Sequence, residues 1–455
     1  MQLSSTDNTE NVQSENKNKQ SIRRPIIHVF TGFRALACLW IFMLHSAIGG
    51  MYEMIKYNIA WLPWSASAGV VLFFCLSGFV MVWTYGDCEF KSTKCYWSFI
   101  GRRAARLFPL YYFSLLLSIS DIKNRWNINK SGPTVNTIYT VSTLIAIQTW
   151  IPYDFDIQSW NDPVWSVQTE WFFYLVFPFL LRLIRYLLNT TKISLLINTN
   201  NKKKSLQRLY IMWFIVFCLA IIPLLFQCKM FNVTNMEQRK GQIVAIYISP
   251  LVRIPEFILG MITGIIYILK SSPDNQNNHI NTDTTITLSS NEDQQQNNES
   301  SLLSLHTNTN HSKYNCHSFI FDIYFLFGIL LFIFICAPLQ YFNPIFAVYP
   351  SIIRMGPFLS FIMCTYLYLS AKYPLSLTSR LLTTSLFINM GEISYAFYCL
   401  AETLPKVFLL ITGIRQQSLI MKLFAGIGIA VFARHHIELP FYTWAHKKLP
   451  KCQCI

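Results

Sequence analysis

Residues 30–46 read FTGFRALACLWIFMLHS, an apolar stretch that carries two polar side chains, Arg34 and His45. The stretch is apolar enough to form a helix inside a membrane. A charge near the bilayer centre costs at least about 2.5 kcal/mol, and side chains retained there are typically functional. Arg34 and His45 are about three helical turns apart, on one face and roughly 16 Å apart along the axis. The ordinary alternative is a snorkelling arginine and a hydrogen-bonded interior histidine.

The composition of the whole chain is that of a membrane protein. Of its 455 residues, 53% are hydrophobic and only 13% are charged, which leaves too little polar surface for a soluble protein of this length. Most of its long apolar runs approach the roughly 20 residues that a spanning helix needs. The sequence predicts an all-α, polytopic membrane helix bundle with about ten transmembrane helices. The runs lie at about 33–48, 70–85, 107–119, 164–188, 209–226, 243–269, 319–340, 351–369, 386–411 and 419–438.

Polar segments divide the chain into five parts. Residues 1–27 are a polar tail, expected to be disordered and cytosolic, without the apolar core of a signal peptide. Residues 28–270 are the first part of the membrane domain, with seven helices. Residues 271–317 are a low-complexity loop rich in Asn, Ser, Thr and Gln, which is expected to be disordered. Residues 318–446 hold the last three helices, and 447–455 form a basic cytosolic tail.

The distribution of Lys and Arg predicts how the chain is oriented, because these residues collect in cytoplasmic loops. The rich segments are 17–24, 91–106, 182–208 and 447–451. All four segments lie in the cytosol only if the weakly apolar stretch 138–151 does not cross the membrane. Both termini are then cytosolic. These loops account for the net charge of +15, so no nucleic-acid partner is expected. The twelve cysteines are scattered without metal-ligand spacing, and no metal site is expected.

Two other segments place charges at helix ends. In SFIGRRAARLFPLYY, residues 98–112, Arg103 and Arg106 lie at positions i and i+3 and face the same side. In WSVQTEWFFYLVFPFLL, residues 165–181, Glu170 lies at the edge of an aromatic helix, where a carboxylate is costly unless paired or hydrated. The ordinary alternatives are positive-inside charges for the arginines and an interfacial acid for the glutamate.

Together these stretches resemble the acyltransferase-3 family of integral-membrane acyltransferases. Seven motifs match in order between Phe30 and about Trp444, outside the low-complexity loop. Three departures stand out: Thr31 and Val71 replace acidic positions of the family, and Ala401 stands where a histidine is common. The matching residues are Arg34 with His45, LFFCLSGF (72–79), Arg103 with Arg106, Pro109 and Tyr111, WSVQTEWFFY (165–174), RIPEFILG (253–260), ISYAFY (393–398) and IELP (437–440).

The resemblance implies transfer of an acyl group, often acetyl, from cytosolic acyl-CoA to an acceptor. Arg103 and Arg106 would bind the phosphates of coenzyme A, and the pantetheine arm would run beside the first helix toward His45. His45 would act as general base, and Arg34 would stabilise negative charge or hold the donor. Glu170 would replace the missing acid that orients the histidine. Acyl-CoA is then a co-substrate, and no bound cofactor is expected.

Other interpretations of the same residues remain open. The expected partners are acyl-CoA, an unknown acceptor and the lipid bilayer, but the buried charges could instead line a transporter path. The departures from the family pattern also allow an inactive homologue. A membrane-bound O-acyltransferase of the other large family is disfavoured because the motifs match the first.

Two further groups of polar residues are secondary candidates. Arg253 and Glu256 share a helix face and are expected to neutralise each other as ion-pair partners rather than act as catalysts. His435, His436 and Glu438 lie at the cytosolic end of the final helix and are weighed for a direct role at the site.

Overall fold

The computed structural model describes only part of the chain in detail. The described residues are 24–47, 67–119, 132–151, 161–197, 201–230, 247–271, 316–331, 357–400, 403, 413 and 419–450. Within these ranges every regular element is a helix and no strand occurs, which confirms the predicted all-α class. Residues 272–315 of the predicted loop, and most of both predicted tails, lie outside the described residues.

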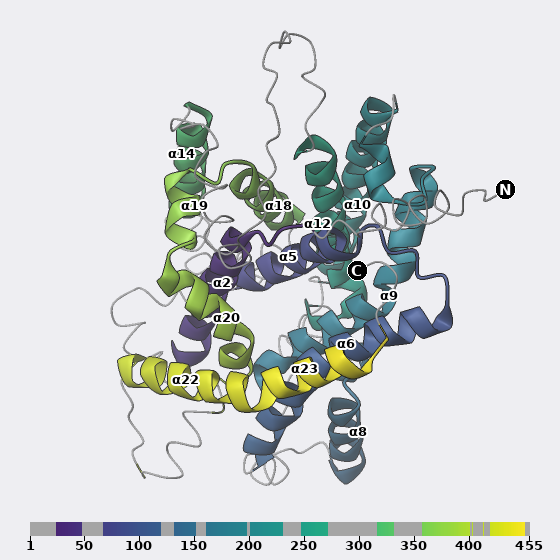
Figure 1. Cartoon of the computed structure of the whole chain (residues 1–455). Helices are drawn as coiled ribbons and strands as arrows, with labels where there is room; N and C mark the ends of the chain where they lie inside the picture. Colours follow the sequence, from purple (N-terminus) through teal and green to yellow (C-terminus); the bar gives the residue numbers. More distant parts are fainter. Residues whose placement is uncertain are drawn as a thin grey trace, which may run out of the picture.

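The helices run in chain order through the bundle (Figure 1). They are α2 (His28–Ala47), α5 (Ser67–Tyr85), α6 (Thr93–Leu117), α8 (Gly132–Leu144), η2 (Gln148–Trp150), η3 (Asp162–Val164), α9 (Trp165–Leu187), η4 (Ile193–Leu196), α10 (Lys202–Met230), α12 (Pro250–Ser271), α14 (Cys316–Leu331), α18 (Pro357–Lys372), α19 (Leu377–Leu382), α20 (Ser385–Leu400), α22 (Leu419–Ala433), η6 (Arg434–Glu438) and α23 (Leu439–Lys448). η6 is a π-helix, and the other η elements are short 3₁₀ helices.

Five of the described helices are long and apolar enough to cross a membrane. Three shorter apolar helices accompany them, so the predicted total of about ten spans is not reached in the described residues. The stretch 138–151, predicted not to cross, overlaps the second half of α8, which at 13 residues is shorter than a span. The five are Ala68–Tyr85, Trp165–Leu187, Lys202–Ile222, Pro250–Ser271 and Ile420–Lys448, and the shorter three are His28–Met43, Cys316–Gly328 and Phe358–Lys372.

Helix α5 lies at the centre of the bundle, where it contacts α12, α2 and α18. Its contact with α12 is a close approach of two backbones. A Cβ atom on Gly78 would lie 2.0 Å from the Phe257 carbonyl oxygen, and one on Gly260 would lie 2.0 Å from that of Cys75. Small residues at such interfaces let membrane helices pack tightly. The α5–α12 pair therefore forms a fixed unit, and α5 is left to present its other side to α6 and α9.

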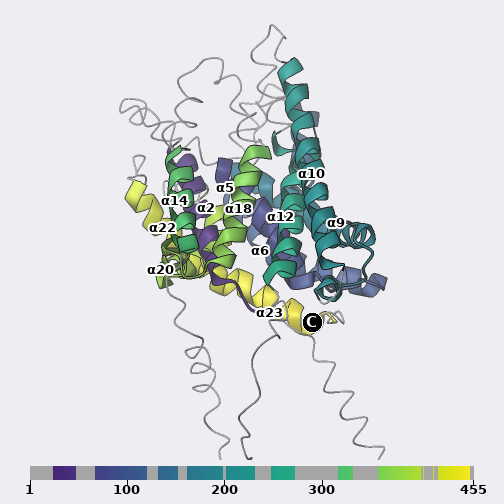
Figure 2. The same ribbon diagram turned by 90° about the horizontal axis from the view of Figure 1, so that it is seen from above.

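The last three elements form one long rod across the bundle. Figure 1 shows α22, η6 and α23 in yellow passing α20 and α6, and Figure 2 shows α23 beside α6 from a second direction. Contacts of α22 with α20, and of η6 and α23 with α6, agree with both views. Leu449 and Pro450 continue the contact: the hydroxyl of Ser98 donates to the Pro450 carbonyl oxygen at 2.5 Å. The C-terminal rod therefore covers one side of α6.

The segment between α5 and α6 is held by polar contacts. The Arg24 guanidinium forms an ion pair with Asp87 at 2.6 Å, and the Arg185 guanidinium donates to the Cys88 carbonyl oxygen at 2.6 Å. Cys88 and Cys95 are both disulfide-bonded. This segment therefore fixes the start of α6 relative to α5 and α9.

Candidate active site

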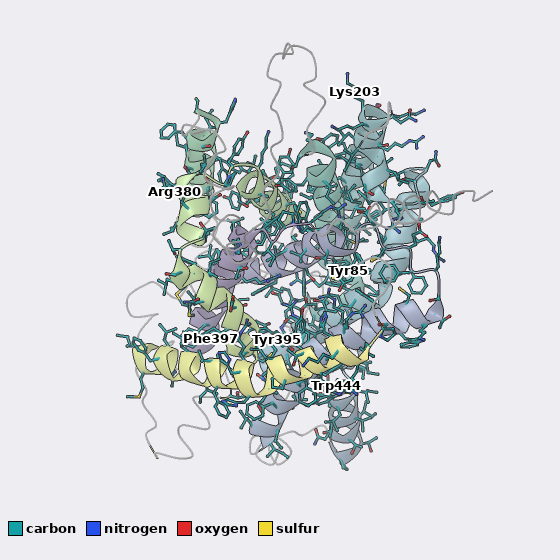
Figure 3. The ribbon with its side chains drawn as sticks, in the orientation of Figure 1. Tyr85, Lys203, Arg380, Tyr395, Phe397 and Trp444 are labelled. Atoms are coloured by element: carbon teal, nitrogen blue, oxygen red, sulfur yellow. The ribbon has the colours of Figure 1, made fainter. Side chains whose placement is uncertain are left out.

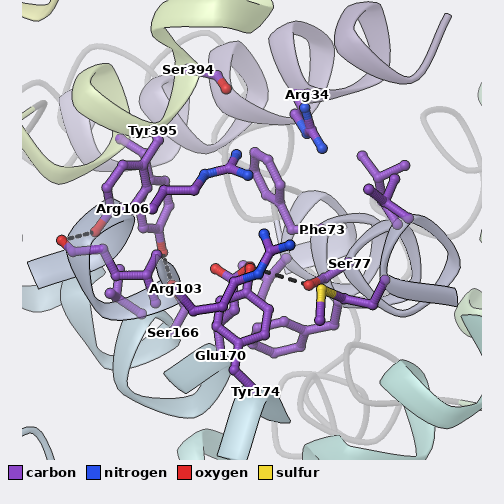
Figure 4. Close-up of a pocket in the computed structure, with 18 residues that line it drawn as sticks. Arg34, Phe73, Ser77, Arg103, Arg106, Ser166, Glu170, Tyr174, Ser394 and Tyr395 are labelled. Carbon is purple, nitrogen blue, oxygen red and sulfur yellow. Dashed lines mark hydrogen bonds between the residues drawn. The ribbon is translucent and has the colours of Figure 1, made fainter. Parts of the chain in front are cut away.

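One cavity brings together four of the five predicted site residues (Figure 4). Its water-accessible interior has a volume of about 90 Å³. Arg34 comes from α2, Arg103 and Arg106 from α6, and Glu170 from α9. In Figure 4 their side chains point into the same space. Residues far apart in the sequence therefore form one charged site.

The cavity is elongated along α5. Val70, Phe73, Ser77 and Met81 are among the α5 residues that line it, and their spacing of three or four positions places them on one helix face. From Val70 to Met81 this face rises about 16 Å. The lining of the cavity therefore extends over about three turns of α5.

Glu170 is hydrogen-bonded on the cavity side of α9. The hydroxyl of Ser77 donates to Glu170 Oε1 at 3.2 Å, and the Tyr174 hydroxyl donates to the same oxygen. These two donors stabilise a carboxylate in a partly buried place, where an unpaired one would be costly. Throughout the described residues, no salt bridge joins Glu170 to an arginine of the cavity. The carboxylate therefore leaves the arginines available to a ligand.

Aromatic rings support the guanidinium group of Arg103. It lies 4.9 Å from the ring centroid of Tyr85, 5.5 Å from that of Tyr174 and 5.7 Å from that of Phe99. Such cation–π contacts hold the group without neutralising its charge. Its Nε atom is buried and has no hydrogen-bond partner in the described part of the chain.

The charge of the cavity favours an anionic ligand. Arg34, Arg103 and Arg106 supply three positive charges against the single carboxylate of Glu170. Among the described residues, none of the three forms a salt bridge within 4.0 Å. Guanidinium groups bind phosphate or carboxylate groups through paired, charge-assisted hydrogen bonds.

Hydroxyl groups supply the remaining polar lining, and sequence reasoning did not single them out. Ser166 Oγ and Tyr398 OH are 2.7 Å apart, and Tyr398 also donates to the Pro163 carbonyl oxygen at 2.8 Å. Ser394 donates to the Gly391 carbonyl oxygen at 2.7 Å within its own helix. Their signal in the sequence is only that they lie inside or beside the motifs WSVQTEWFFY and ISYAFY.

His45 lies in the last turn of α2, but its side chain is outside the described residues. The rings of Phe30 and Phe79 are 4.8 Å apart, while a Cβ on Gly69 would lie 3.0 Å from the Ala37 carbonyl oxygen. Helices α2 and α5 are therefore antiparallel, and the end of α2 that carries His45 lies toward the Val70 end of the cavity. Glu170, by contrast, is bound at Ser77, so its predicted role in orienting His45 stays a prediction.

The pairing predicted for Arg253 and Glu256 is confirmed. Arg253 Nη1 lies 2.6 Å from Glu256 Oε1, and the Arg253 side chain is completely buried. Its Nε atom donates to the Tyr247 carbonyl oxygen at 2.8 Å, and the Tyr247 ring lies beneath the guanidinium. Neither charged residue lines the cavity. The pair neutralises itself inside the bundle.

The positions at which this chain departs from the family pattern have different structural surroundings. Val71 is completely buried in an apolar cluster that includes Leu259 and Leu367. A carboxylate at that position would lack a polar partner in this cluster, so the valine suits its surroundings. Ala401 lies outside the described residues.

The apolar helices of the fold indicate a membrane protein, and comparison with known proteins identifies the family. Residues 27–433 match the acyltransferase-3 family model, described as an acyltransferase domain. The chain belongs to this family. It is similar to the acyltransferase MdmB of Streptomyces mycarofaciens, with 31% identity over 157 residues, or 34% of this chain and 39% of that protein. The match thus spans less than half of that relative. No solved structure shows a significant match.

Proposed function

We propose that the protein transfers an acyl group, acetyl in the simplest case, from cytosolic acyl-CoA to a hydroxyl or amine acceptor such as a carbohydrate or lipid. One observation carries the proposal: three guanidinium groups, without salt bridges in the described residues, converge on one long cavity. Membership of the family supports acyl transfer as the reaction. Acyl-CoA as the donor and the class of acceptor are proposed in addition to the reaction that family membership supports.

The shape and charge of the cavity support coenzyme A as the carrier. Arg103 and Arg106 would bind its phosphates through bidentate contacts. The pantetheine arm would follow the α5 face from Met81 toward Val70, a rise of about 16 Å. Its thioester would then arrive on the side where α2 ends with His45.

The reaction itself needs a base and a group that stabilises negative charge. The neutral imidazole of His45 would take the proton of the acceptor as its oxygen or nitrogen attacks the thioester carbonyl carbon. The carbon–sulfur bond then breaks, and the coenzyme A thiolate leaves and is protonated. Such base catalysis contributes about 10²- to 10⁴-fold in rate. Arg34 would hold the donor or stabilise charge that develops on it.

The membrane arrangement completes the proposal. The protein would cross a plasma or internal membrane about ten times, with both termini in the cytosol. This orientation places the Arg-rich start of α6 on the side where acyl-CoA is made available.

Acyl transfer by the purified full-length protein in lipid nanodiscs tests the proposal. Radiolabelled acetyl-CoA and an extract of the protein's own cells are supplied, and label should move into an acceptor fraction. The His45→Ala variant should lose this transfer, whereas Arg380→Ala, at an exposed position on α19 (Figure 3) that does not line the cavity, should keep it. Solute flux that needs no acyl-CoA would favour a transporter. A folded protein without either activity would favour an inactive homologue.

A further inference from the structure

A second cavity lies where α9 ends and α10 begins. Its water-accessible interior has a volume of about 540 Å³. The end of α9, the turn that follows it, the short helix η4 and the start of α10 form its walls. No described residue lines both this second cavity and the candidate active site. The two are therefore separate, and the proposed acyl transfer makes no use of the second cavity.

One face at the start of α10 forms the polar wall of the second cavity. Its members lie at positions i, i+3, i+4 and i+7 on one side of the helix, and they are Asn201, Lys204, Ser205 and Arg208. Arg208 Nη1 donates to the Leu187 carbonyl oxygen at 3.3 Å, which ties α10 to the last residue of α9. Since a guanidinium has five N–H donors, Arg208 keeps donors for an acceptor in the cavity.

The second cavity has an excess of positive charge. Lys204 and Arg208 line it, and no Asp or Glu among the described residues does. Neither cation forms a salt bridge within 4.0 Å in the described part of the chain, and residues 171–236 contain no acidic residue. The Asp87 carboxylate, which accepts a backbone hydrogen bond from η4, is already paired with Arg24 at 2.6 Å. The cavity therefore favours an anionic ligand.

The second cavity lies at the basic end of a lipid-facing helix. Helix α10 contains one of the five segments that are apolar enough to cross a membrane, yet only 11% of that segment is buried in the described structure. Figure 2 shows α10 at the edge of the bundle. Tyr186 and Leu195 line the cavity and are exposed, as is common for such side chains at a membrane interface. Positive-inside counting predicts that this end is cytosolic, and the cytoplasmic leaflet carries anionic lipids.

We infer that the second cavity binds the phosphate group of an acidic membrane phospholipid. Lys204 and Arg208 form charge-assisted hydrogen bonds to the phosphate, and the buried Ser205 lies between them on the same helix face. Ile211 and Ile215, three and seven positions after Arg208, continue this face and are exposed. They are available to the acyl chains. This continuity of cationic and apolar surface favours a lipid over a soluble phosphate.

Equilibrium binding to the purified full-length protein in uncharged detergent tests the site with three probes. Dioctanoyl phosphatidic acid has the phosphate and the chains, dioctanoyl phosphatidylcholine has the same chains with no net charge, and glycerol 3-phosphate has the phosphate without chains. Phosphatidic acid should bind most tightly. Equal affinity for glycerol 3-phosphate would assign the cavity to a soluble phosphate and overturn the lipid assignment. Equal affinity for phosphatidylcholine, or no binding of phosphatidic acid, would also overturn it.

Variants in α10 then locate the binding. Lys204→Gln and Arg208→Gln should each raise the Kd for phosphatidic acid about fivefold. Lys203→Gln is the matched control, because Lys203 carries the same charge at the adjacent exposed position (Figure 3) but does not line the cavity. It should leave the Kd within about twofold.

The same measurements separate this site from damage to the fold and from the candidate active site. If Arg208→Gln does not fold because the contact with Leu187 is lost, Lys204→Gln, at an exposed position, still tests the site. The His45→Ala variant should bind phosphatidic acid like the parent, whether or not the protein transfers acyl groups. An unchanged Kd in Lys204→Gln, or equal weakening by Lys203→Gln, would overturn the inference.

Discussion

The hydroxyl of Ser77 on α5 donates a hydrogen bond of 3.2 Å to Glu170 Oε1 on α9. This contact joins the central helix of the bundle to the helix that carries the cavity's acid. Because the acceptor is a carboxylate among arginines, the contact fixes where the negative charge lies relative to the three positive ones. Among the described residues, Glu170 forms no salt bridge with these arginines.

Ser77→Ala removes one of the two donors to Glu170. A hydrogen bond to a charged group contributes about 1.5 to 3 kcal/mol, so the variant should unfold at a lower temperature. Ser394→Ala is the matched control, since Ser394 donates to a neutral carbonyl within its own helix and its loss should cost about 1 kcal/mol. Thermal unfolding in nanodiscs measures both, and equal losses would contradict a special role for the Ser77 contact.

Arg103→Ala and Arg106→Ala should weaken donor binding before they reduce turnover. Each removes charge-assisted contacts to phosphate of about 1.5 to 3 kcal/mol, equivalent to a rise in KM for acyl-CoA of about 10- to 150-fold. Steady-state kinetics with varied acyl-CoA measures the effect. An unchanged KM with reduced kcat would place the phosphates elsewhere.

His45→Ala should reduce turnover rather than the binding of the acyl donor. It removes the proposed base, so kcat should fall about 10²- to 10⁴-fold while acyl-CoA binding is kept. Arg34→Lys keeps the positive charge but loses the planar fork, and a marked loss there indicates directed hydrogen bonding. Normal turnover by a folded His45→Ala protein would refute the assignment of the base.

Glu256→Ala should destabilise the bundle without a direct effect on chemistry. It leaves the completely buried Arg253 charge without its partner, at a cost of about 3 to 5 kcal/mol. Replacing both residues, as Arg253→Met with Glu256→Leu, should recover much of the stability because no buried charge remains. Thermal unfolding of the two variants tests this, and a double variant no more stable than the single one would contradict it.

The predicted orientation of the chain in the membrane can be tested, and the loop before α6 is the place where the evidence conflicts. Positive-inside counting predicts that this loop is cytosolic, yet Cys88 and Cys95 are disulfide-bonded, a state that oxidising compartments maintain. In intact cells, impermeant reagents should fail to reach tags on the N-terminal tail, residues 271–317 and the C-terminal tail. Thiol labelling then shows whether the two cysteines are reduced at this face. Tags that are accessible from outside would reverse the predicted orientation.

Local patterns in the sequence predict some of these features well. The spacing of Arg253 and Glu256 places both side chains on one helix face, and an ion pair at i, i+3 needs no knowledge of other helices. Apolar runs likewise predict helices in a membrane. The convergence of Arg34, Arg103, Arg106 and Glu170 follows from the packing of three helices, which side-chain spacing alone does not specify.

Other features leave little trace in the sequence. Ser77 and Tyr174 are ordinary residues within apolar helices, and their role emerges only when Glu170 lies beside them. The π-turn at Arg434–Glu438 adds a single residue to a helix, and the change from the apolar α22 to the polar RHHIE does not by itself indicate a π-turn. In the sequence, Glu438 is therefore only a single charged residue near the end of a helix, although its side chain is buried in the bundle.

The backbone contact between α5 and α12 has a consequence for how a ligand enters. Gly78 and Gly260 let the backbones of these helices pack in direct contact, so we expect the α5 wall of the cavity to be held firmly. We expect any widening during entry and release to come from the opposite wall, where α6 lies between the cavity and the C-terminal rod. Motion of that rod would then set the pace of substrate exchange, independently of the chemistry at the thioester.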